Sequence, residues 1–102
     1  IWSNDGWVDR FGLDLPRGDT GYGHTAEDVG KVRAGADLLA GYYRAVHAMT
    51  LDYVTTVTGD QLERIVDKRW TPAVTASARL VSIVDDCAQH LGQAAYVRGI
   101  AD

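Results

Sequence analysis

Hydrophobic residues recur at helical spacing along two long stretches of the chain. In residues 27–57 the apolar side chains stand three or four positions apart, and Gly59 supplies a stop. A second stretch, residues 75–98, has the same spacing and is followed by Gly99. Since no segment shows the alternation of a half-buried strand, we expect two long amphipathic helices and an all-α fold.

The first quarter of the chain is expected to be a loop region that carries one short helix. Residues 1–24 are rich in glycine and aspartate, and Pro16 interrupts any regular element. A helix over residues 4–11 would end at Gly12. The helical part of the domain then begins near Thr25, whose hydroxyl can accept a hydrogen bond from the amide three residues later.

The chain of 102 residues is one small domain, made of residues 1–24 and the helical residues 25–102. Residues 60–66 predict a further helix of about two turns, and a connector with a proline follows at residues 70–72. Two long amphipathic helices enclose too little apolar surface to be stable alone, so we interpret them as half of a four-helix bundle. The other half is expected from N-terminal helices missing from this sequence or from a second copy in a homodimer.

Composition excludes several classes of partner. The net charge is −4 and lysines and arginines do not cluster, so no nucleic-acid surface is expected. No uncharged stretch is long enough to span a bilayer, and the N-terminus does not resemble a signal peptide, so we expect no membrane partner. The single cysteine, Cys87, fits a reducing compartment and a cytoplasmic protein. It falls on the apolar stripe of the second long helix, where a buried thiol would be inert.

Asp86 and His90 are the residues most suited to carry chemistry. They are four positions apart, so on a helix they lie one turn apart on the same face. A step of about 100° per residue places them on a flank of the apolar stripe, with Gln93 close by. A carboxylate and an imidazole at this spacing can bind one metal ion from a single helix. The alternative is structural, with the two side chains hydrogen-bonded to each other and to a neighbouring helix.

Three other residues are weaker candidates. His47 follows Tyr43 by one turn on the first long helix, and is either a third ligand or a histidine at the core edge that donates to a carbonyl. His24 is expected to be a surface loop residue unless the loop brings it to a site. Arg98 lies in the last turn of its helix, where a cation is favourable, and either extends to solvent or forms a buried ion pair or anion contact.

Four segments resemble the DinB-like superfamily, which includes thiol-dependent S-transferases and the mycothiol-dependent maleylpyruvate isomerase. They are residues 5–13, 19–25, 43–50 and 89–99, the last with the run His-Leu-Gly-Gln and a closing Arg-Gly. The resemblance, to an actinobacterial-type member, implies a four-helix bundle of which this chain is the C-terminal portion.

The same resemblance implies a metal site. Members have one histidine ligand on the second helix and two ligands four residues apart on the fourth, to which Asp86 and His90 correspond. The second-helix histidine has no counterpart in this chain, and His47 falls on the third helix, outside the ligand set. His47, Gln93 and Arg98 remain candidates for contacts around the ligands.

The implied cofactor is a divalent metal, zinc or nickel. Such an ion keeps a low-molecular-weight thiol, for example mycothiol, as the thiolate that attacks a small electrophile. The resemblance therefore predicts a metal-dependent thiol S-transferase. A helical metal-binding, dimerisation or scaffold protein of the same fold, without catalysis, is the alternative.

Overall fold

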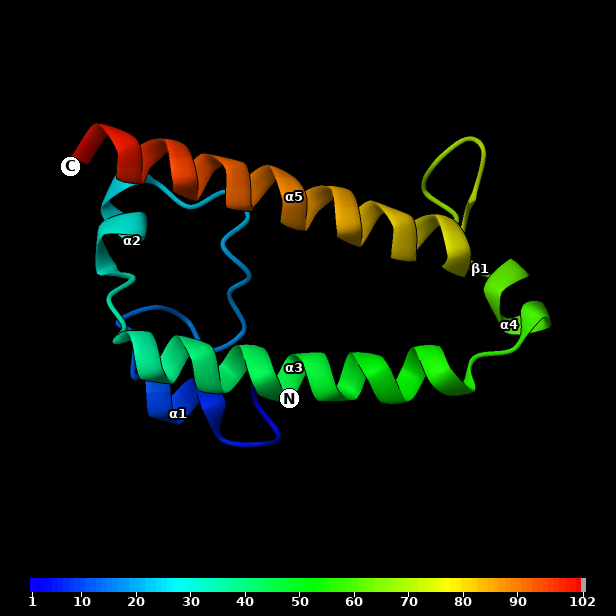
Figure 1. The fold of residues 1–102 in the computed structure, drawn as a ribbon, viewed down its shortest axis with the longest axis horizontal. Coiled ribbons are helices and arrows are strands. Elements are labelled where there is room, and N and C mark those ends of the chain that lie inside the picture. Colours follow the sequence, from blue (N-terminus) through cyan, green and yellow to red (C-terminus); the bar gives the residue numbers. More distant parts are fainter. Residues whose placement is uncertain (102) are drawn as a thin grey trace. The chain divides into compact units, whose positions relative to one another are not determined.

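The computed structural model describes residues 1–101. The chain divides into two compact units, Ile1–Thr55 and Thr56–Asp102 (Figure 1). The described residues form two long helices, three short helices and one two-stranded sheet. The helical class expected from the sequence is therefore right in outline, and the four-helix bundle stays a prediction.

The N-terminal unit holds three helices: α1 (Trp7–Phe11), α2 (Ala26–Lys31) and α3 (Ala36–Thr56). Helix α1 is shorter than expected at its start, because Gly6 is left-handed, and it ends at the expected Gly12. Helix α2 begins at Thr25 with the predicted capping box. The Thr25 hydroxyl accepts from the amide of Asp28, and the Asp28 carboxylate accepts from the amide of Thr25.

The expected continuous helix over residues 27–57 is wrong, because the chain leaves the helix after Lys31. Val32 is extended, and the next helical residue is Ala36. Glycines flank the break on both sides, and the Arg33 side chain donates to the carbonyl of Gly30 at 3.2 Å. Low helix propensity and a side chain that satisfies the freed carbonyl together explain why the helix ends here.

A cluster of aromatic rings forms the core of the N-terminal unit. Trp7 is buried against Tyr42 of α3, with ring centroids 5.5 Å apart, and Trp2 and Phe11 lie 5.5 and 5.7 Å from the same tyrosine. Helix α1 packs beside the first half of α3 (Figure 1). Gly41 makes this approach close, because a Cβ atom there would lie 3.2 Å from the Trp7 ring.

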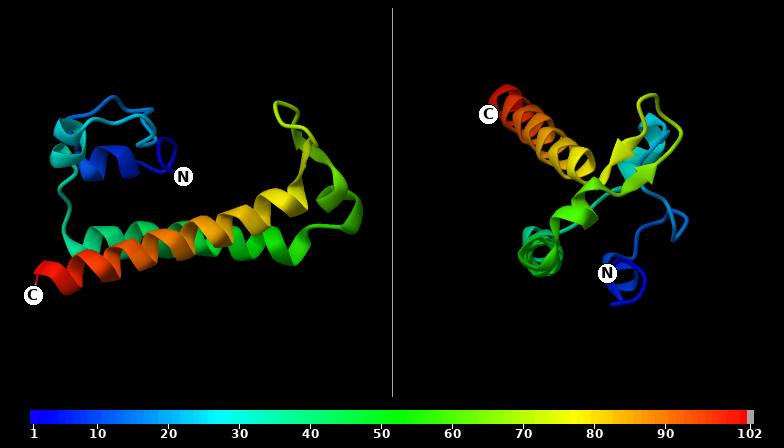
Figure 2. Two further views of the ribbon diagram at one scale, coloured as in Figure 1. Left: turned by 90° about the horizontal axis from the view of Figure 1, so that it is seen from above. Right: turned by 90° about the vertical axis from the view of Figure 1, so that its right-hand side faces the viewer.

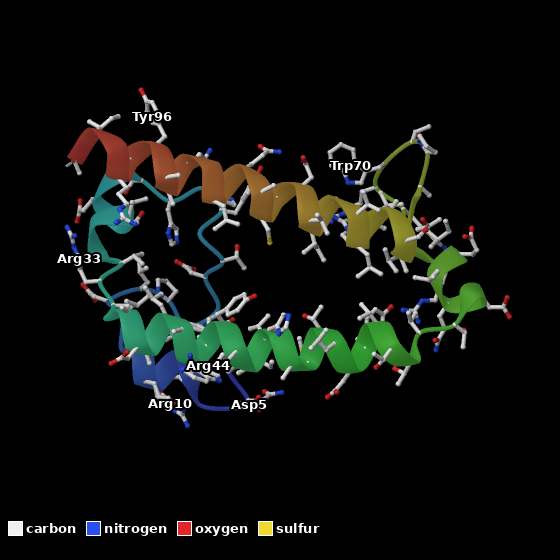
Figure 3. All side chains as sticks on the ribbon, in the orientation of Figure 1. Asp5, Arg10, Arg33, Arg44, Trp70 and Tyr96 are labelled. Carbon is white, nitrogen blue, oxygen red and sulfur yellow. The ribbon has the colours of Figure 1, made fainter. Side chains whose placement is uncertain are left out.

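Polar contacts fix the loop after α1. The Arg17 guanidinium donates two hydrogen bonds to Asp9, at 2.6 and 3.2 Å, and these hold the pKa of the Asp9 carboxyl below its usual value. The Trp2 indole donates to the carbonyl of Arg17 at 2.9 Å. The guanidinium of Arg10, a residue of α1 (Figure 3), lies 4.6 Å from the centroid of the Trp7 ring. The loop is thus tied to both the helix and the aromatic cluster.

The C-terminal unit contains helix α4 (Gly59–Glu63), strands β1 (Ile65–Asp67) and β2 (Val74–Thr75), and helix α5 (Ala76–Ala101). The strands pair antiparallel, and the hairpin meets the start of α5 (Figure 2). The helix expected over residues 60–66 is therefore present but ends at Glu63, and the expectation of no strand is wrong. Strands of three and two residues are too short to show an alternating pattern.

One carboxylate joins this hairpin to α5. Asp67 is only 8% exposed, and its oxygens accept from the Arg69 amide, the Arg69 guanidinium and the Arg79 guanidinium at 2.8–3.0 Å. The hydrogen bonds from Arg69, aided by the positive charge of Arg79, hold the pKa of Asp67 well below its usual range. This fully partnered carboxylate connects the end of β1 and the loop of the hairpin with the first turn of the long helix.

Most of α5 is exposed, and two expectations about it are corrected. Ala76 is the one buried residue of the helix, and Cys87 is exposed rather than packed in a core. The helix also passes through Gly99, which is not among the glycines with positive φ and so forms no left-handed stop. None of the described helices is both long and apolar enough to cross a membrane.

The role of Gly41 can be tested by adding one methyl group. Alanine in place of a helical glycine normally stabilises by about 1 kcal/mol. We expect Gly30→Ala, where a Cβ meets nothing within 4 Å, to show this gain, and Gly41→Ala to lose it because the Trp7 ring must move. Urea unfolding followed by the Trp7 indole NMR signal measures both. An equal gain for the two variants would contradict the close packing.

The Asp67 carboxylate predicts an acid-labile C-terminal unit. A carboxyl whose pKa is lowered by folding stabilises at neutral pH, and this contribution is lost as the pH falls below about 4. Asp67→Asn should lower stability at pH 7 and flatten the loss between pH 4 and 2. The NMR signal of the Trp70 indole, on the loop between the strands, reports unfolding of this unit (Figure 3). Asp60→Asn, an exposed acid of the same unit, is the control and should keep the wild-type pH profile.

Candidate functional site

Helix α5 carries the residues with the clearest chemistry, and its first turn is firmly held. The Ala76 amide donates to the Arg64 carbonyl at 2.9 Å. The Thr75 hydroxyl accepts from the Ala78 amide at 3.1 Å, which caps the helix. Arg79 is bonded to Asp67 as described above. From this anchored start, the helix runs without interruption through the predicted metal pair.

The structure brings Asp86, His90 and Gln93 together on one face of α5. The Nε2 atom of His90 lies 3.6 Å from Oδ1 of Asp86, and Nδ1 lies 3.0 Å from Oε1 of Gln93. Both members of the pair are open to solvent, with side-chain exposures of 70% for His90 and 74% for Asp86. The side chains converge as the spacing predicts.

The contact with Gln93 favours one tautomer of the neutral imidazole. With Oε1 of Gln93 as the acceptor, Nδ1 of His90 donates, and Nε2 of the neutral ring then presents its lone pair on the side of Asp86. A ligand nitrogen and a ligand oxygen each bind zinc at about 2.0–2.2 Å. Two such atoms at a separation of 3.6 Å can therefore contact one ion placed between them.

The pair is not a complete metal site by itself. In the part of the chain that the structure describes, no group of three or more His, Cys, Asp or Glu side chains could hold a metal ion. The adjacent Asp85 instead accepts a hydrogen bond from Gln89 at 2.8 Å. Any complete site on α5 needs ligands in addition to Asp86 and His90.

The remaining sequence candidates are found on two helices. His47 belongs to α3, in the N-terminal unit, where its ring stacks on Tyr43 with centroids 5.6 Å apart and an angle of 19°. Arg98 occupies the last turn of α5, as expected. Of the candidates for contacts around the predicted pair, Gln93 is the one whose hydrogen bond to His90 the structure defines.

A second polar pair, which the sequence did not predict, lies in the N-terminal unit. Nε2 of His24 lies 3.0 Å from Oδ2 of Asp19, and the His24 side chain is only 13% exposed, unlike a surface loop residue. Both residues line a pocket of about 630 Å³. Gly21 and Gly23 have φ of +89° and +76°, and this turn folds the loop back so that the two side chains meet. The sequence signal for this pair is the two glycines, Gly21 and Gly23, that lie between Asp19 and His24.

Comparisons with known proteins agree with the fold. The sequence matches the family Mycothiol-S-transferase over residues 1–102. No curated protein matches it. A solved structure, the crystal structure of the conserved protein of locus from Enterococcus faecalis, is 42% identical with a TM-score of 0.84. The match covers 93% of this chain and 56% of that chain, so the chain spans a little over half the length of this relative.

The orientation of the His90 ring gives a direct test of the Gln93 contact. We expect wild-type His90 to show the tautomer with hydrogen on Nδ1, because Gln93 accepts from that atom. Gln93→Leu should shift the neutral ring toward hydrogen on Nε2, where Asp86 can accept. Two-bond ¹H–¹⁵N NMR spectra of the imidazole measure this. Gln89→Leu removes a glutamine bonded to Asp85 instead, and should leave the tautomer unchanged.

Proposed function

The chain belongs to the mycothiol S-transferase family of the DinB-like superfamily, and from this we propose that the complete protein transfers a low-molecular-weight thiol to an electrophile at a divalent metal. Asp86 and His90 would be two of the metal ligands. The thiol would be of the mycothiol type, as the family name suggests, and the metal would be zinc or nickel.

The observation that carries this proposal is the convergence of His90 and Asp86 on one face of α5. When Nδ1 donates to Oε1 of Gln93, a neutral ring presents the Nε2 lone pair 3.6 Å from a carboxylate oxygen. A cation between these two atoms, whether a metal ion or a proton on Nε2, is favoured at this distance. A histidine whose other nitrogen donates to a fixed acceptor is also the usual arrangement around bound metals.

The residues of α5 can perform three tasks in such a site. His90 supplies a neutral nitrogen ligand, Asp86 supplies negative charge, and Gln93 holds the imidazole ring in place. When bound, a divalent ion lowers the pKa of a coordinated thiol, so that the thiolate is present near neutral pH. This chemistry needs no nucleophile from the protein, so Cys87 has no role in the proposal.

A further ligand is needed, and we expect it from outside the described residues. The apolar side of α5, with Val84 and Leu91, is exposed and is the surface that neighbouring helices of a bundle would cover. The solved relative has a longer chain than this one. We therefore favour helices of a longer chain as the source of the remaining ligand, with a homodimer as the alternative.

A second candidate function is metal binding without catalysis. The openness of the pair favours it, because a solvent-exposed ion is less able to hold a reactive thiol away from water. The two functions share the ligands and differ only in the presence of a thiol and an electrophile, so one set of measurements distinguishes them.

The test compares matched variants of the full-length protein. His90→Ala and Asp86→Ala should each lower bound metal at least about 10-fold, since losing one ligand leaves too few to fix the ion. His47→Ala and Asp85→Ala, which remove the same groups elsewhere, should keep wild-type metal content. Bound metal is measured by mass spectrometry after dialysis. Thiol conjugation is measured as the rate at which the protein joins mycothiol to each of a panel of electrophiles.

Two results would change the conclusion. Full metal occupancy in His90→Ala, or an empty site in His47→Ala, would contradict the ligand assignment. A wild-type protein that binds metal but conjugates no thiol would favour metal binding without catalysis.

A further inference from the structure

The pocket of the N-terminal unit has the size and the fixed walls of a small-molecule site. Its volume of about 630 Å³ lies in the range of ligand pockets, roughly 300–1,000 Å³. Trp2 and Tyr42 contribute aromatic walls, and Leu13, Leu15 and Val32 contribute apolar ones. These residues come from the N-terminal segment, the loop after α1, the break after α2 and helix α3, all within one compact unit.

The walls are held in place before any ligand arrives. The Trp2 indole is fixed by its hydrogen bond to the Arg17 carbonyl, and the Arg17 side chain is fixed by two bonds to Asp9. Tyr42 is packed among three aromatic rings. A ligand would therefore enter a preorganised cavity, where little conformational entropy is lost on binding.

The charges around the pocket favour a cation. Asp19 is its one formally charged lining residue, and none of the described lining residues is a lysine or an arginine. A carboxylate only accepts, so Nε2 of His24 donates to Oδ2 of Asp19. In the described residues nothing donates to the other oxygen, Oδ1, which therefore stays available to a ligand.

From these features we infer that the pocket binds a small amine, with an apolar body against Trp2 and Tyr42 and an ammonium group at Asp19. Ammonium groups donate to carboxylates in charge-assisted hydrogen bonds. They are also attracted to the faces of aromatic rings. A carboxylate or phosphate ligand would instead meet the negative charge of Asp19, and the lining offers it no lysine or arginine. This site is independent of the thiol chemistry proposed for α5.

The test uses three probes of similar size that differ in charge. They are 2-phenylethylamine as the cation, 2-phenylethanol as the neutral molecule and 3-phenylpropanoate as the anion. Titrations of the ¹⁵N-labelled full chain, followed by NMR, should show the amine shifting the Trp2 indole signal and binding about 10- to 100-fold more tightly than the alcohol. The anion should bind more weakly than either.

Two matched variants locate the charge that matters. Asp19→Asn keeps the shape of the side chain and an oxygen that can accept from His24, so the loop should stay folded. It should lower the affinity for the amine about 10-fold or more and leave the alcohol unchanged. Asp14→Asn removes the same charge from an exposed position of the same loop that does not line the pocket, and should have no effect.

Several results would overturn the inference. One is an anion that binds as tightly as the amine. Another is an equal loss of affinity for the amine in Asp14→Asn and Asp19→Asn. A third is a Trp2 indole signal that no probe moves at millimolar concentration. Unfolding midpoints of both variants, compared with wild type, show whether a loss of binding follows from a loss of folding.

Discussion

The carboxylate of Asp67 is the interaction on which the C-terminal unit depends. It is nearly buried, and it is shared by Arg69 in the hairpin and Arg79 in the first turn of α5. A buried charge is costly unless every oxygen is partnered, and here both oxygens are. The contact therefore determines where α5 begins relative to the hairpin. Everything farther along the helix, including the metal pair, is positioned from this point.

The N-terminal unit is also positioned by an ion pair, but by an exposed one beside an apolar core. Its apolar core is a small group of aromatic rings around Tyr42, and the loop that closes the pocket is tied down by the Asp9–Arg17 ion pair. That ion pair is exposed, so by itself it adds little stability. Its effect is geometric, because it fixes the Arg17 carbonyl that accepts from Trp2. Short-range polar contacts thus position the walls of a site in a unit that encloses little apolar surface.

Sequence reasoning succeeded where a feature is local and failed where it depends on distant partners. The Thr25 capping box and the Gly12 stop involve residues within four positions of each other, so the pattern determines them. The strands β1 and β2 are stabilised by each other and by Arg64, which no local pattern reveals. Periodicity predicts a buried Cys87, because it shows which face of the helix is apolar. It does not show whether anything covers that face, and in the structure Cys87 is exposed.

The same distinction applies to the two candidate sites. Asp86, His90 and Gln93 lie within two turns of one helix, so their convergence followed from spacing alone. The pocket needs a loop folded back by two left-handed glycines and a tyrosine from α3, and only the structure brings these together. A third ligand for the metal site proposed on α5 would belong to this second class, because in the described residues no third His, Cys, Asp or Glu joins the pair. Helix spacing therefore places the two ligands proposed on α5. Completion of the site depends on packing against residues far away in the sequence.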